Sequence, residues 1–112
     1  MNLDAIPAPD REQVATFRTD ELTALCPFDF GGPDFYDLTL RYVADESAVE
    51  SRSLKRYLER WRGEEITVED LADVIYADVE QAIAPTQLYV RLEQARRGGV
   101  EETVEVWDCA LG

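Results

Sequence analysis

The sequence predicts an α+β domain, in which one four-stranded antiparallel sheet carries two helices on one face in the order strand, strand, helix, helix, strand, strand. Apolar and polar residues alternate with the period of two that is typical of strands in four segments, residues 13–25, 34–44, 88–95 and 100–107. Between the second and third segments the period changes to about 3.6, which indicates amphipathic helices. A chain of 112 residues has the size of one domain, and we assign residues 13–112 to it.

The N-terminal part of the chain predicts an arm followed by two paired strands. Residues 1–12 are rich in proline and aspartate, and we expect them to form a loose arm. The first strand, 13–25, alternates imperfectly and ends at Cys26-Pro27, before a loop that contains Gly-Gly-Pro. The second strand is regular and directs to one face Tyr36, Leu38, Leu40 and Tyr42.

Two helices are predicted in the middle of the chain. From Glu50 onward an apolar stripe at helical spacing predicts the first, which Gly63 is placed to end. Thr67 begins the second, with Asp70 in a capping-box-like spacing, and Pro85 stops it. The first stripe consists of Leu54, Tyr57, Leu58 and Trp61, and the second of Leu71, Val74, Ile75, Val79, Ala82 and Ile83.

The last two strands are joined by Arg97-Gly98-Gly99, whose glycines predict a tight turn. A four-stranded sheet with helices on one face leaves its other face and its edges uncovered. We therefore expect the chain to form a homo-oligomer, as small domains often do.

The composition is strongly acidic, with 24 acidic residues against 11 basic ones and a net charge of −13. Such a charge repels nucleic acid and anionic membranes unless a local basic patch overrides it. The chain has no apolar run of membrane-spanning length and no signal-like N-terminus, so we expect a cytoplasmic protein. Lys55 is the only lysine, against ten arginines, which is similar to the surface chemistry of proteins from salt-rich cytoplasm.

Histidine is absent, which excludes histidine-based catalytic dyads and zinc motifs. Cys26, at the end of a predicted strand, is either a nucleophile or a small buried apolar residue, and Cys109 has less in its favour as a nucleophile. Asp34 could return to the sulfur across the hairpin and exchange a proton with the substrate, or it could simply form a turn. Glu69 suits the first turn of a helix, and its carboxylate could also accept two parallel hydrogen bonds from a guanine-like base.

Five basic residues fall within eleven positions of this acidic chain, namely Arg52, Lys55, Arg56, Arg60 and Arg62. They could form the solvated face of an amphipathic helix and pair with Glu59. They could equally form an anion site, in which helix amides and cationic side chains hold a phosphate. Arg97 and Gly98 could join such a site, because glycine lets the backbone approach a ligand closely.

Three motifs together resemble one known family. They are LCPFDFGGPDF at residues 25–35, Glu50-Ser51-Arg52-Ser53-Leu54-Lys55, and Arg97-Gly98-Gly99. The chain resembles the NADPH-dependent 7-cyano-7-deazaguanine reductases of queuosine biosynthesis, short nitrile reductases of the tunnelling-fold superfamily. This resemblance implies a tunnelling fold and a homo-oligomer whose sites lie between subunits.

The resemblance also implies the chemistry. A nitrile would be reduced to a primary amine, 7-aminomethyl-7-deazaguanine, with two NADPH and no metal. Cys26 would attack the nitrile carbon to form a thioimide, and Asp34 would supply a proton. The residues implied to bind the deazapurine are Val49, Glu50, Ser51, Val68 and Glu69; those implied to bind NADPH are Ser51, Arg52, Lys55, Arg97 and Gly98.

Two positions depart from the family pattern. Val68 stands where the family has histidine, and Arg52 stands where it has lysine. One alternative is a related archaeal amidinotransferase, which adds ammonia to the nitrile on a nucleic acid, whereas a reductase needs no nucleic-acid partner. The other alternative is a non-enzymatic acidic assembly subunit. Whether a reductase product would serve tRNA or DNA modification stays open.

Overall fold

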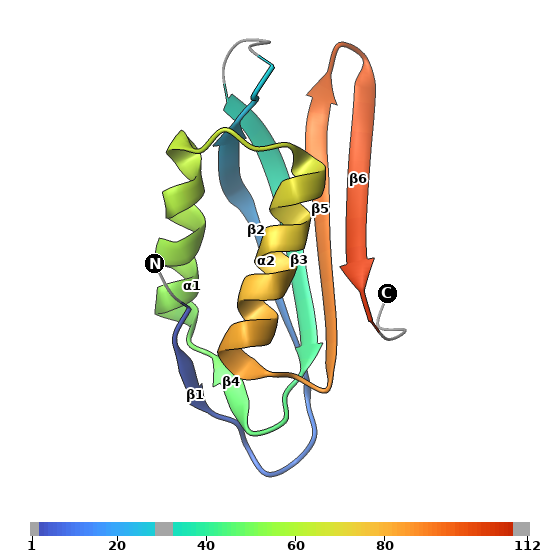
Figure 1. Ribbon diagram of the computed structural model, residues 1–112. Helices are drawn as coiled ribbons and strands as arrows, with labels where there is room; N and C mark the ends of the chain where they lie inside the picture. Colours follow the sequence, from blue (N-terminus) through green and yellow to red (C-terminus); the bar gives the residue numbers. More distant parts are fainter. Residues whose placement is uncertain (1–2, 29–32, 109–112) are drawn as a thin grey trace.

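The computed structural model describes residues 3–28 and 33–108 (Figure 1). For Arg97, which lies within the second range, it describes the backbone but not the side chain. The elements follow in the order β1 (Ala5–Pro7), β2 (Val14–Leu25), β3 (Pro33–Val43), β4 (Ser47–Val49), α1 (Ser51–Glu59), the 3₁₀ helix η1 (Arg60–Gly63), α2 (Val68–Ile83), β5 (Gln87–Arg97) and β6 (Val100–Trp107). A four-stranded antiparallel sheet has the order β2-β3-β5-β6, and both α-helices lie on one face of it (Figure 1). The predicted fold class is confirmed.

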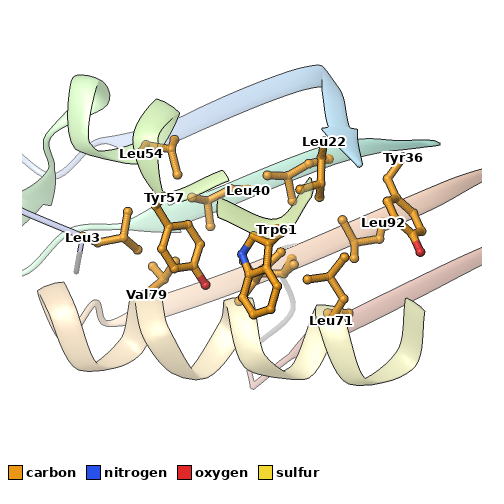
Figure 2. Close-up of a cluster of buried hydrophobic side chains, with 14 of the residues drawn as sticks. Leu3, Leu22, Tyr36, Leu40, Leu54, Tyr57, Trp61, Leu71, Val79 and Leu92 are labelled. Carbon is orange, nitrogen blue, oxygen red and sulfur yellow. The ribbon is translucent and has the colours of Figure 1, made fainter. Parts of the chain in front are cut away.

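The core lies between this sheet and the helices. Side chains at alternate positions of β3 and β5 point toward the helices, among them the fully buried Leu40 and Leu92. Leu71 and Val79 of α2 and Tyr57 of α1 meet them from the other side (Figure 2). Each large apolar side chain buried in this way contributes about 1.5–3 kcal/mol. The apolar residues that alternate along the strands and those that follow the helical spacing therefore pack against each other in one core.

The segment predicted to be a loose arm, residues 1–12, is partly ordered, and the prediction is wrong there. Residues 5–7 form β1, which pairs antiparallel with β4 in a separate two-stranded sheet. Leu3 is buried in the core, the Asp4 N–H donates to Ser53 Oγ at 2.9 Å, and the Glu50 N–H donates to the Asp4 carbonyl at 2.9 Å. One apolar anchor and paired backbone groups thus hold a segment whose composition is typical of a loop.

A β-bulge interrupts β2. Thr19 pairs with Leu38 of β3, but the next pair joins Leu22 to Tyr36, so β2 has one residue more than its partner over this step. Before the bulge the half-buried residues of β2 are at odd positions, such as Phe17, and after it the fully buried Leu22 is at an even one. The bulge explains the imperfect alternation of residues 13–25.

The helix ends follow the capping rules. The Glu50 side chain caps α1, because its carboxylate accepts the N–H groups of Arg52 and Ser53 at 2.9 Å each. Thr67 Oγ1 caps α2 by accepting the Asp70 N–H at 3.2 Å, as its spacing predicts. The predicted first helix does end at Gly63, but it is not an α-helix throughout. Its last turn, Arg60–Gly63, is the 3₁₀ helix η1. Within the described residues, no helix has the length and apolar character needed to cross a membrane.

Candidate active site

Four segments meet at one end of the sheet, the upper end in Figure 1. The end of β2 pairs with the start of β3, Leu25 opposite Pro33. The segment before α2 is fastened to the same place, because the Leu25 N–H donates to the Glu64 carbonyl at 2.9 Å and the Ile66 N–H donates to the Leu25 carbonyl at 3.1 Å. The first turn of α2 therefore lies near the end of β2, and the first residues of β6 lie at the same end of the sheet, where α2 packs against β6 (Figure 1).

Cys26 follows the last residue of β2 and is partly exposed. Its Sγ accepts the N–H of Phe28 at 3.4 Å, across the turn that begins at Pro27. A partly exposed thiol is accessible to a small molecule, which a fully buried one is not. Cys109, the other cysteine of the sequence, lies outside the described residues.

Asp34 and Tyr36 lie beside Cys26 on the face of the sheet that the helices cover. Asp34 is opposite Ala24 on β2 and is only 5% exposed. Burial raises the pKa of Tyr36, and the charges of Asp34 and Cys26 and a hydrogen bond to Asp34 raise it further. This contact with Asp34 falls outside strict hydrogen-bond geometry, so the Tyr36 hydroxyl is buried without a well-aligned partner. The buried carboxyl group of Asp34 thus lies between Tyr36 and the end of β2 that Cys26 follows.

Two further carboxyl groups influence each other at this end. Glu69 lies in the first turn of α2 and Glu102 on β6. Hydrogen bonding between the two carboxyl groups lowers the pKa of Glu69, with help from its own backbone N–H and Thr67, and raises the pKa of Glu102. In the sheet Glu102 lies opposite Gln94, which lies opposite Tyr36, so the three residues form one row across β6, β5 and β3.

The sequence reasoning missed Glu102, although one signal was present. In residues 100–107 the even positions carry Val104 and Val106, which are partly buried against the core, and Glu102 has the same parity. An acidic residue in an apolar row of a strand indicates either a partner or a function.

The residues around the start of α1 form a second group. Val49 is buried, and its N–H donates to the Tyr42 hydroxyl at 3.0 Å. The Glu50 carboxylate is occupied with capping, whereas Ser51, Arg52 and Lys55 are exposed. This group lies at the other end of α1 from the end of β2, which Cys26 follows (Figure 1). The helical stretch between them is about 20 Å long by the rise of α- and 3₁₀-helices.

A groove of about 530 Å³ runs between β2 and α1. Basic residues line it from both sides, Arg18 from β2 and Lys55 and Arg62 from the helical side. Two acidic residues, Glu21 and Glu59, line it as well, and apolar contacts come from Leu54, Leu58 and Phe17. Ser51 is also part of its wall, so two of the residues that the motif assigns to a cofactor face this groove.

The remaining predicted site residues have clear structural positions. Val68 is the first residue of α2 and is buried in the core, only 4% exposed. Gly98 and Gly99 have φ values of +59° and +81° and form the turn between β5 and β6, as predicted. The side chain of Arg97 lies outside what the structure describes. One chain therefore places Cys26, Asp34 and Glu69 at the same end of the sheet, whereas the start of α1 lies at the other end.

Comparisons with known proteins show the family of the chain. The family model described as QueF-like protein matches residues 33–111. Two relatives named NADPH-dependent 7-cyano-7-deazaguanine reductase come from Syntrophus aciditrophicus and Chlorobaculum tepidum. The first is 43% identical over 97 residues, which cover 87% of this chain and 69% of the relative. The second is 38% identical over 98 residues, which cover 88% of this chain and 83% of the relative.

A solved structure has the same fold. It is described as the archaeosine synthase QueF-Like in the apo form, and its TM-score is 0.75 over 89% of this chain and 94% of that chain. The sequence identity is 22%, so this likeness concerns the fold alone.

Proposed function

Because the chain belongs to the QueF-like protein family, we propose that it is an NADPH-dependent nitrile reductase, which converts 7-cyano-7-deazaguanine to 7-aminomethyl-7-deazaguanine. The names of its relatives support this substrate and cofactor. The observation that carries the proposal is that Cys26 directly follows β2 while the buried Asp34 lies opposite Ala24, two residues before it, on the paired strand β3. A nucleophile and a proton donor on adjacent strands are what addition to a nitrile requires.

In the first step Cys26 Sγ adds to the nitrile carbon. A C–S bond forms, the C≡N triple bond becomes a C=N double bond, and the nitrogen gains a proton, which leaves a neutral thioimide. Asp34 passes that proton to the nitrogen and regains one from the thiol, so the step is balanced. Because Asp34 is 5% exposed, little water competes with it for this transfer.

Glu69 is suited to recognise the base. Its carboxylate lies in the first turn of α2, and the hydrogen bonds of Glu102, its own N–H and Thr67 keep it ionised. A carboxylate can accept two parallel hydrogen bonds from the N–H and NH₂ edge of a deazaguanine. Val68 is directed into the core, so its side chain contributes shape to the site and no proton transfer.

The groove between β2 and α1 fits the charge of the cofactor. The phosphates of NADPH would be held by Ser51, Lys55 and Arg62 on one side of the groove and by Arg18 on the other. Arg52, in the first turn of α1, is exposed. NADPH, when bound, supplies the hydrides of the reduction. Arginine keeps the positive charge of the family's lysine at position 52, which phosphate binding requires.

We also propose that a second copy of the chain completes the site. The start of α1 and the end of β2 lie at opposite ends of the helical stretch, about 20 Å apart by helix rise, which is too far for one deazapurine to contact both within a chain. β2 and β6 are open edge strands, which can pair with another chain. Apolar Phe28 and Phe35 are exposed at this end of the sheet, where a partner would cover them.

The test is an assay of NADPH absorbance with 7-cyano-7-deazaguanine, at low and high salt, for the unmodified chain, Cys26→Ala and Cys109→Ala. We expect oxidation with the unmodified chain and with Cys109→Ala, and none with Cys26→Ala. Mass spectrometry should find a substrate adduct on Cys26.

Two other outcomes separate the competing functions. An adduct on Cys26 that consumes ammonia but never NADPH would favour an amidinotransferase. Neither an adduct nor oxidation in any salt concentration would leave a non-enzymatic subunit.

A further inference from the structure

The groove between β2 and α1 extends well past the residues that the motif at 50–55 assigns to a cofactor. Arg62, at its far end, lies seven residues beyond Lys55, which is about 11 Å along the helix axis. The helical side of the groove follows the spacing of one helix flank, at positions i, i+3, i+4, i+7, i+8 and i+11. These residues are Ser51, Leu54, Lys55, Leu58, Glu59 and Arg62. The groove therefore has a cationic point that is separate from the motif.

The lining of the groove suits a nucleoside that carries a phosphate. Phe17 and Leu58 line it and are only partly buried, so each offers apolar surface to a flat ring. The carboxylates of Glu21 and Glu59 also line it, and they can accept hydrogen bonds from the hydroxyl groups of a ribose. Its volume of about 530 Å³ is in the range of small-molecule and cofactor sites.

The guanidinium of Arg62 is able to bind a ligand. Its Nη1 lies 3.9 Å from Glu59 Oε2, at the long limit of an ion pair, and its side chain is 57% exposed. A guanidinium has five N–H donors in a planar fork, so this loose pair leaves donors for a phosphate. Exposed ion pairs contribute little to stability, so a substitution of Arg62 should leave the fold intact.

The proposed function indicates which end of the dinucleotide lies at Arg62. The start of α1 would meet Cys26 of a second copy, so the nicotinamide, which carries the hydride, belongs at the Ser51 end of the groove. In NADPH the nicotinamide ribose is followed by the pyrophosphate and then by the adenosine with its 2′-phosphate. In that order Lys55 would meet the pyrophosphate and Arg62 the adenosine end. At this end the last residue of β2 is hydrogen-bonded to the segment after η1, which closes the groove.

We propose that Arg62 is a specificity-determining residue for the cofactor: its guanidinium binds the 2′-phosphate of the adenosine and thereby selects NADPH over NADH. This inference rests on the proposed function and deepens it. Arginine presents two parallel N–H donors that match a phosphate, and it accommodates the 2′-phosphate in other dinucleotide sites. NADH has a neutral hydroxyl at the same place, so it loses this charge-assisted contact.

The experiment measures binding by calorimetry at one fixed ionic strength, because salt screens exposed charges. The probes are NADPH, NADH and two fragments that contain only the adenosine end, adenosine 2′,5′-bisphosphate and adenosine 5′-monophosphate. The proteins are the parent, Arg62→Gln and, as a matched control, Arg56→Gln. The control removes the same charge from an exposed position of α1 that does not line the groove.

We expect the parent to bind NADPH about tenfold or more tightly than NADH, and the bisphosphate more tightly than the monophosphate by a similar factor. Arg62→Gln should lose both preferences, because its Kd values for NADPH and the bisphosphate rise while those for NADH and the monophosphate stay the same. Arg56→Gln should keep both preferences.

Three results would overturn the inference: an Arg62→Gln variant that still prefers NADPH as the parent does, one whose Kd for NADH rises as much as that for NADPH, or an equal loss of preference in Arg56→Gln. The second result would assign Arg62 to the pyrophosphate or to the nicotinamide end. In each of these cases the parent still binds NADPH, so the proposed function stands. If the parent binds neither NADPH nor NADH, the proposed function fails together with the inference.

Discussion

Replacing Ser53 with alanine should detach the N-terminal strand from the domain. Ser53 is 2% exposed, its Oγ donates to the Glu50 carbonyl at 2.8 Å, and it accepts the Asp4 N–H at 2.9 Å. At about 1 kcal/mol net for each hydrogen bond, the variant should lose about 2 kcal/mol of unfolding free energy. A 112-residue chain has an unfolding entropy of about 0.24 kcal/mol per kelvin near its Tm, so the Tm should fall by about 8 °C.

Two measurements check this expectation. Calorimetry gives the Tm, and hydrogen exchange of the Glu50 amide, which donates to the Asp4 carbonyl, reports whether the strand is released. Ser51→Ala is the matched control, because Ser51 is exposed in the same helical turn and the gain in helix propensity is the same for both changes. If Ser53→Ala changes neither the Tm nor the protection of Glu50 more than Ser51→Ala does, the reasoning is refuted.

Three further expectations concern stability. Tyr57→Phe removes the 2.5 Å hydrogen bond to Asp78 Oδ2 and should lower the unfolding free energy by about 2 kcal/mol, measured by urea unfolding; an unchanged midpoint would contradict it. The N–H groups of Arg52 and Ser53 hold the pKa of Glu50 below its usual 4.5, so its contribution is present above that value and is lost as the pH falls through the lower folded pKa. Glu50→Gln should therefore be less sensitive to acid than the parent between these two values, and equal acid sensitivity would argue against the cap. Because the net charge is −13, the Tm should rise as NaCl screens the surface, and a Tm that is flat or falls would argue against repulsion among the acidic residues.

The sequence predicted those parts of the fold that carry their own periodicity. β3 and β5 have one face against the core, so their alternation had to appear in residues 34–44 and 88–95. β1 and β4 could not be found in this way, because each has three residues and their pairing is made by the backbone. What holds β1 in place is a contact between Asp4 and Ser53, far apart in the chain, which no local pattern encodes.

In the candidate site, too, some features follow from local sequence and others only from the tertiary structure. Cys26 and Asp34 belong to one pair of adjacent strands, so their approach followed from local spacing. Glu69 and Glu102 meet only because α2 packs against β6, and this is a property of the tertiary structure. Three of the six residues in the motif 50–55 have a structural role that the sequence did not reveal. Glu50 caps α1, and the side chains of Ser53 and Leu54 are buried.

The bulge in β2 makes the orientation of the nucleophile depend on a count of residues. Strand positions alternate between faces, so the extra residue between Thr19 and Leu22 exchanges the faces of everything that follows it, Cys26 included. A chain one residue shorter there would keep every motif intact and yet direct its sulfur to the face of the sheet opposite Asp34. Such a chain would be unable to form the proposed thioimide. Length in a stretch without reactive side chains is therefore a requirement of the proposed chemistry.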